Sequence, residues 1–135
     1  LNGVRHLAIA GTWFYAATPA GVVVLDMSEP LTPRYVTTIE VSDPRAAQVQ
    51  FRYLFVSTRE GLQTVDVTDP TRPRIVTGAV VPLANAQKFT VSRVYAYVAN
   101  GEDGVAIVDV TKPEAPTLYR MYDADGAIDD ARDAI

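Results

Sequence analysis

The sequence predicts an all-β protein built from one repeated unit of four strands. A corner motif, Asp-x-Ser/Thr-x-Pro-x-x-Pro, begins at Asp26, Asp66 and Asp109, which lie 40 and then 43 residues apart. A largely apolar segment precedes each motif, and an aromatic segment precedes each of these apolar segments. A period near 40 residues with strand-like content is typical of the blades of a β-propeller.

We expect one domain over residues 1–135, with about three four-stranded antiparallel blades at residues 4–41, 44–81 and 86–123. Residues 131–135 are expected to be the first strand of a fourth blade. Closed propellers use about 4–8 blades, and an open stack of repeats leaves apolar faces in water. The sequence therefore favours a segment of a larger closed propeller, with the remaining blades of the same chain as partners, over a self-assembling half-propeller.

The first two strands of each unit are predicted from an apolar segment, a tight turn and an aromatic segment. The large side chains of Tyr95 and Tyr97 alternate with Ala96, which is the period of two expected of a strand. The predicted first strands are 5–10, 45–50 and 87–92, the turns are 11–12, 51–52 and 93–94, and the aromatic segments are 13–15, 53–55 and 95–97.

The third and fourth strands follow a short polar loop that ends in a glycine, where positive φ is expected. The third strand is nearly continuous in apolar residues, which suits a strand covered on both faces. The fourth strand is more polar and is expected at the outer edge of the blade. The glycines are Gly21, Gly61 and Gly104, the third strands 22–25, 62–65 and 105–108, and the fourth strands 34–39, 74–78 and 117–122.

The corner motif has a structural interpretation. An aspartate at this point can accept hydrogen bonds from the backbone N–H groups that follow it, as in an Asx-turn. The proline four positions later fixes φ and stops the third strand from continuing. Three equivalent copies indicate a scaffold rather than catalysis. The corner residues are Asp26, Asp66, Asp109, Pro30, Pro70 and Pro113.

Composition excludes several classes of function. The chain is 48% hydrophobic and 21% charged, as in an ordinary folded domain, and no segment approaches the roughly 18 apolar residues of a membrane span. It has no cysteine, so disulfides, thiolate metal sites, thiol catalysis and c-type haem attachment are excluded within these residues. The net charge of −4 is carried by residues 123–135, and no basic stripe for nucleic acid is present.

The segments 21–26, 61–66 and 104–109, each followed by Ser/Thr-x-Pro, resemble the LVIVD repeat of bacterial and archaeal proteins. The segment Tyr-Ala-Tyr-Val-Ala-Asn-Gly at 95–101 is also similar to that family, and the first unit departs from it at 16–19 and at Met27. The resemblance covers essentially the whole chain. It implies a β-propeller from an exported or cell-surface prokaryotic protein, and it supplies no catalytic residues and no cofactor.

One candidate ligand site is an anion site at the mouth of the central channel. Arg5, Arg45 and Arg132 begin equivalent first strands, and Gln87 takes their place in the third unit. Innermost strands line the channel of a propeller, so these side chains could converge on a carboxylate or phosphate. The alternative is pairing of each arginine with a neighbouring carboxylate, such as Asp43 beside Arg45.

Loop lengths distinguish the two ends of the repeat. The corner aspartate and the second proline are always seven residues apart. The passage from that proline to the next first strand grows from 12 (33 to 45) to 14 (73 to 87) to 16 residues (116 to 132). Insertions confined to one face of a repeat protein often mark its recognition surface, although drift in exposed loops produces the same pattern.

Other constellations are weaker. Asp123, Asp125 and Asp129 could suggest calcium, but the spacing of an EF-hand is not met, so no metal is assigned. His6 is the only histidine, and no thiol or second imidazole can complete a zinc site with it. Without Gly-x-Ser-x-Gly or another convergent set, no enzymatic activity is predicted. The aromatic cluster at 13–15 is expected to be core between blades.

We therefore expect a non-enzymatic binding scaffold from an exported or cell-surface prokaryotic protein, presenting loops to a protein or polysaccharide partner. The alternative is an accessory propeller domain of a larger extracellular redox protein of the multihaem cytochrome type, or of a hydrolytic protein. Flanking sequence separates the two hypotheses. Repeated Cys-x-x-Cys-His motifs would favour the redox protein, and further repeats with an anchoring tail would favour the scaffold.

Overall fold

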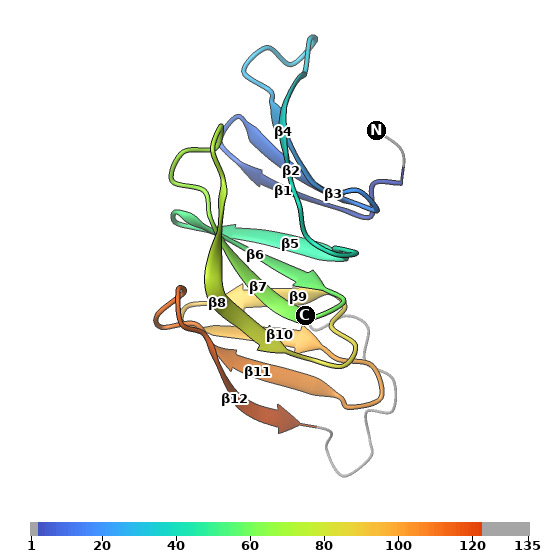
Figure 1. The fold of residues 1–135 in the computed structure, drawn as a ribbon, viewed down its shortest axis with the longest axis vertical. Coiled ribbons are helices and arrows are strands. Elements are labelled where there is room, and N and C mark those ends of the chain that lie inside the picture. Colours follow the sequence, from blue (N-terminus) through green and yellow to red (C-terminus); the bar gives the residue numbers. More distant parts are fainter. Residues whose placement is uncertain (1–2, 123–135) are drawn as a thin grey trace.

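The computed structural model describes residues 3–122, in which twelve strands form three four-stranded antiparallel sheets (Figure 1). The all-β class and the four-stranded unit predicted from the sequence are confirmed. Blade one contains β1 (His6–Ala10), β2 (Trp13–Thr18), β3 (Gly21–Asp26) and β4 (Arg34–Ile39). Blade two contains β5 (Ala46–Gln50), β6 (Tyr53–Thr58), β7 (Gly61–Asp66) and β8 (Arg74–Pro82). Blade three contains β9 (Phe89–Ser92), β10 (Tyr95–Ala99), β11 (Val105–Asp109) and β12 (Thr117–Tyr122).

Each blade is a simple meander in which every strand is hydrogen-bonded to the next one along the chain. The first strands of successive blades contact one another, β1 against β5 and β5 against β9. The fourth strands β4, β8 and β12 form the opposite edges of the sheets (Figure 1). The first strand is therefore the inner strand of each blade and the fourth is the outer one, as predicted.

The first and second strands are joined by two-residue turns. The turns lie between the paired residues Ala10 and Trp13, Gln50 and Tyr53, and Ser92 and Tyr95. Their first positions have positive φ: 61° at Gly11, 56° at Phe51 and 57° at Arg93. Two-residue hairpins favour this conformation because it matches the right-handed twist of the strands.

The core consists of two apolar clusters, one at each junction between blades. On β6, Leu54 and Val56 belong to the cluster with blade one, whereas Phe55 belongs to the cluster with blade three. Blade two is therefore covered on both faces, which accounts for the nearly continuous burial of β6. In β11, by contrast, Ala106 and Val108 are buried while Val105 and Ile107 are half-buried, because one face of blade three has no neighbouring blade within residues 3–122.

Strand β8 differs from the prediction, which ended it at residue 78. It continues to Pro82 through an irregularity in its pairing with β7, between Gln63 and Val65. The side-chain amide of Gln63 donates to the carbonyl oxygens of Thr64, Val76 and Ala79, at 2.9, 3.2 and 3.1 Å. Because the amide binds carbonyl groups that the ladder leaves unpaired, the extra residues remain within the sheet.

The predicted first strand of a fourth blade at 131–135 lies outside the described residues. So do Arg132 and the weak calcium candidates Asp123, Asp125 and Asp129. Over residues 3–122, no helix has the length and apolar character required to cross a membrane.

Candidate binding face

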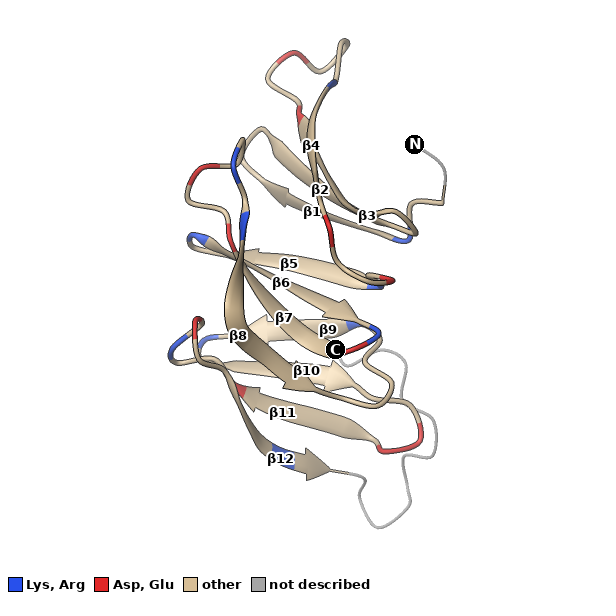
Figure 2. Ribbon diagram, in the orientation of Figure 1, with Lys and Arg blue, Asp and Glu red and all other residues tan. Residues whose placement is uncertain are grey.

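The blades have two loop-bearing ends, which the charged residues mark clearly (Figure 2). We call one end the corner face, because it carries the corner loops 27–33, 67–73 and 110–116. We call the other end the variable face, because it carries the passages of unequal length between blades and the loops that precede the third strands. Lys, Arg, Asp and Glu gather at these two ends, whereas the strand interiors are largely free of them except for Arg120 in β12.

On the corner face, the three aspartates form the same closed turn. The Oδ1 atoms of Asp26, Asp66 and Asp109 each accept a hydrogen bond at 2.9 Å from a backbone N–H two residues later. The hydroxyl groups of Thr68 and Thr111 donate to the same oxygens at 2.6 Å. These bonds bind the carboxylates to their own loops, which is the geometry of an Asx-turn.

The corner carboxylates are held in the ionised form. The N–H of Ser28, followed by the guanidinium of Arg34 at 2.7 Å, lowers the pKa of Asp26 to about 2. The hydroxyl of Thr68 is the main cause of the lowered pKa of Asp66, and the hydroxyl of Thr111 has the same effect on the pKa of Asp109. Carboxylates of this kind are ionised near neutral pH, and they accept the hydrogen bonds that shape the corner loops.

We expect Asp26→Asn to remove a pH-dependent part of the stability. A folded pKa of about 2 lies below the value of about 3.9 for an unfolded aspartate, so the contribution is fully present above about pH 4 and is lost as the pH falls toward about 2. The variant should therefore be less stable than wild type at pH 7, and the difference should close between about pH 4 and 2. Urea unfolding at pH 7, 4, 3 and 2 measures this; a difference that stays constant would contradict it.

At the inner end of the variable face, the two described arginines of the predicted anion site share one carboxylate. Arg5 pairs with Asp43 through Nη1, and Arg45 reaches the same carboxylate through Nη2 at 3.2 Å. The hydrogen bond from Arg5, supported by Arg45, lowers the pKa of Asp43 despite partial desolvation. The guanidinium groups also reach backbone carbonyl oxygens of the following blade, Arg5 to Pro44 at 3.3 Å and Arg45 to Ala86 at 2.8 Å.

These contacts define what the predicted anion site would require. Gln87 donates to the side-chain oxygen of Asn85, and Arg132 lies outside the described residues. An anion at Arg5 and Arg45 would have to compete with Asp43, which already contacts both guanidinium groups. The anion site therefore stays a prediction, and the pairing with Asp43 that was its alternative is the arrangement present.

Sequence reasoning missed a second set of contacts along the inner strands. The amide of Gln48 donates to the carbonyl of Val91 at 3.3 Å and accepts from its N–H at 3.1 Å. Gln50 donates to the carbonyl of Arg93 at 3.0 Å, and the Nδ1 atom of His6 accepts from the N–H of Ala47 at 3.2 Å. Each contact caps the open backbone edge of the following blade, which would otherwise be free to pair with another strand. Polar side chains at every second position of an apolar strand were the available signal.

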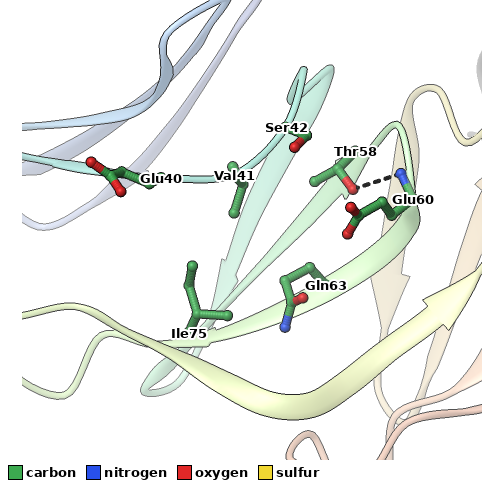
Figure 3. Close-up of a pocket in the computed structure, with 7 residues that line it drawn as sticks. All are labelled: Glu40, Val41, Ser42, Thr58, Glu60, Gln63 and Ile75. Atoms are coloured by element: carbon green, nitrogen blue, oxygen red, sulfur yellow. Dashed lines mark hydrogen bonds between the residues drawn. The ribbon is translucent and has the colours of Figure 1, made fainter.

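The variable face also contains a pocket of about 250 Å³ at the junction of blades one and two, which we call the Glu60 pocket (Figure 3). It is formed by the passage from β4 to β5, the loop from β6 to β7, and strands β7 and β8. Figure 3 shows Glu60 and Gln63 on one side, with Ile75 and Val41 forming an apolar wall. The hydroxyl of Thr58 accepts the N–H of Glu60 at 3.1 Å and orders that loop. The lining residues are Glu40, Val41, Ser42, Thr58, Glu60, Gln63 and Ile75.

Four-stranded antiparallel meanders that pack face to face, with their first strands innermost, define a β-propeller repeat protein. The family model of the LVIVD repeat matches residues 3–44, 48–78 and 84–124, one match for each blade. The chain therefore belongs to the LVIVD repeat family, and the family predicted from the glycine, aspartate and proline spacing is confirmed.

Solved structures show the same fold at low sequence identity. The chain is similar to the computationally designed Ika4 protein, with a TM-score of 0.70, 12% identity and coverage of 98% of this chain and 79% of that one. It is similar to a chain of the nidogen/laminin complex, with a TM-score of 0.59 and 13% identity over 87% of this chain and 48% of that one. It is also similar to Hsv2 of Kluyveromyces lactis, with a TM-score of 0.55 and 16% identity over 86% of this chain and 35% of that one. The chain thus spans less than half of these two larger proteins, and no curated protein matches it.

Proposed function

We propose that this chain is a non-enzymatic binding scaffold that takes a protein partner on its variable face, at the Glu60 pocket. The observation that carries the proposal is the position of this pocket. It lies where the passage from blade one meets the β6–β7 loop of blade two, at the end of the repeat where the connections differ in length. The corner face repeats one closed turn three times, with its aspartates bound to their own loops, and offers no comparable variation.

The chemistry of the pocket favours a cationic side chain of the partner. Glu60 supplies a carboxylate beside Gln63, Glu40 lies on the opposite side of the pocket (Figure 3), and none of the lining residues is basic. Val41 and Ile75 supply an apolar wall. A lysine or arginine side chain has a matching construction, because its apolar stem packs on such a wall while its charged head meets the carboxylate of Glu60.

The comparisons support a protein partner by analogy only. The propeller similar to this chain in the nidogen/laminin complex was solved together with another protein. Export to the cell surface follows from the family resemblance and is part of the proposal. Digestion of intact cells with a protease that cannot enter them tests this placement: the full-length protein should be cleaved, and complete protection would contradict it.

Site-specific cross-linking in the native host tests the binding face. A photo-reactive residue replacing Ser42 should cross-link a partner that is sensitive to protease and resistant to glycosidase. The same residue at Thr32, in a corner loop, is the control and should capture nothing. Glu60→Lys should abolish the Ser42 product, because it places a cation in the pocket, whereas Glu29→Lys on the corner face should leave it intact. Equal products from both faces, no product, or a glycosidase-sensitive product would contradict the proposal.

A further inference from the structure

The two outward-facing sides of the stack are apolar. We call the side of blade one that faces away from blade two the leading face, and the side of blade three that faces away from blade two the trailing face. On the leading face, Leu7 and Ile9 are 43% and 57% exposed. The trailing face carries half-buried Tyr95 and Tyr97, with the ring of Tyr95 packed 5.6 Å from that of Tyr119, which is exposed.

Each of these faces is one half of an interface that the chain already forms twice. Tyr15, Phe55 and Tyr97 occupy the same position in their blades, ten residues after Arg5, Arg45 and Gln87 respectively. Tyr15 is 1% exposed and Phe55 is 0% exposed, because the leading face of the next blade covers each of them. Tyr97 occupies the equivalent position on the trailing face, but within residues 3–122 no following blade packs on it, and it is half-buried. The converse holds for Leu7, whose equivalents Ala47 and Phe89 are buried under the preceding blade.

The polar contacts between blades have a direction as well. In the contacts described above, side chains in or beside the inner strand bind the backbone of the next blade or of the segment leading into it, as Gln48 binds Val91 and Arg45 binds Ala86. The positions equivalent to Gln48 and Gln50 in blade three are Thr90 and Ser92, which can hydrogen-bond in the same direction. The positions equivalent to Val91 and Arg93 in blade one are Ile9 and Gly11, on the open edge of β1. The trailing face of blade three and the leading face of blade one therefore complement each other.

We propose that a second copy of this chain docks head to tail, its trailing face on the leading face of the first. The occupant proposed is a second copy, because both faces belong to this chain and together repeat the interface that it forms at both internal junctions. Such an interface joins two different surfaces, and it closes when the rotation per blade completes a circle. Two copies supply six blades, twice the three described, which is within the range of about 4–8 for closed propellers. Further blades of a longer polypeptide, which the repeat number favours, are the other possible occupant, and the test below distinguishes the two.

The proposal is independent of the proposed function. The Glu60 pocket lies at the junction of blades one and two on the variable face, and it includes none of the residues of the leading or trailing faces. Loss of partner cross-linking at the pocket and loss of association between copies can therefore be observed separately.

Sedimentation equilibrium of the purified 135-residue chain tests the association. Over about 1 to 500 µM, a range that brackets moderate protein–protein affinities, the average mass should rise from 14.7 kDa toward that of two copies. Ile9→Arg on the leading face and Tyr97→Arg on the trailing face should each hold the mass at 14.7 kDa, with circular dichroism unchanged. Leu31→Arg is the matched control, because Leu31 is 96% exposed in a corner loop; it should associate like wild type.

Mixing the two variants tests the direction of docking. The Ile9→Arg chain keeps an intact trailing face and the Tyr97→Arg chain keeps an intact leading face, so an equimolar mixture should form a one-to-one pair. A variant that dimerises alone would overturn the proposal, because it would show like faces in contact. A wild-type chain that remains monomeric over the whole range would also overturn it, and would leave further blades of a longer polypeptide as the occupant of both faces.

Discussion

Gly61→Ala is expected to destabilise the fold by about 3–5 kcal/mol, the largest single effect of a glycine substitution in the described chain. Gly61 begins β7 with φ of 138°, a conformation that L side chains rarely adopt. A Cβ atom there would collide with the carbonyl oxygen of Val81 and would lie 2.8 Å from the backbone nitrogen of Leu83. Both are backbone atoms of the neighbouring segment, so no flexible side chain can move aside.

Gly11→Ala is the matched control for this substitution. Gly11 also has positive φ, at 61°, but a Cβ atom there meets nothing within 4 Å. Only the cost of the left-handed conformation remains, about 1–2 kcal/mol. Chemical denaturation of both variants at one protein concentration gives the comparison. Equal losses would show that conformation alone, and not the close approach of β8, requires glycine at position 61.

Phe55→Ala is expected to cost a similar amount, about 3–5 kcal/mol, because it opens a cavity in the junction between blades two and three. Phe55 is fully buried in an apolar cluster that includes Val81 and Leu83 of its own blade and Phe89 and Val108 of the next. The β-sheets on both sides are rigid, so the cavity cannot collapse completely. Because the cluster joins two blades, the lost free energy of unfolding reflects weaker packing between blades two and three.

Phe51→Ala removes the same side chain from an exposed site and serves as the control. Phe51 is 93% exposed in the turn between β5 and β6, so its truncation should change the free energy of unfolding by less than about 0.5 kcal/mol. Urea unfolding followed by circular dichroism measures both variants. If Phe55→Ala were as mild as Phe51→Ala, the junction between blades would contribute little to stability and the packing argument for a propeller would fail.

Most of the secondary structure could be predicted from the sequence because its determinants are local. The two-residue turns, the corner prolines and the glycines with positive φ act within a few residues of themselves, and the hydrophobic pattern has the period of a strand. The end of β8 was predicted wrongly because it depends on Gln63, which lies 13 and 16 residues from two of the carbonyl oxygens that it binds. Gly78 has a low propensity for a strand, so the sequence indicates a strand end there. No local signal indicates that the amide of Gln63 holds the following residues in the sheet.

The candidate site was only partly predictable for the same reason. The equivalent positions of Arg5 and Arg45 were visible in the repeat, but their common contact with Asp43 depends on how closely blade one approaches blade two. The Glu60 pocket joins residues of one blade to the passage that leads into it, and no motif marks that combination. The sequence places Gln48 and Gln50 in a predicted strand, but it does not indicate that they cap the edge of blade three.

The sequence by itself determined the repeat, the order of strands within each blade, the turns, and the residues available for the core. These follow from backbone conformational preference and from the alternation of side chains across a strand. Only the tertiary structure decided which faces are covered, which side chains cap the next blade, and where the pocket lies. Those contacts join residues about 40 positions apart, and their geometry is set by the twist of each sheet and by the packing of one blade against the next.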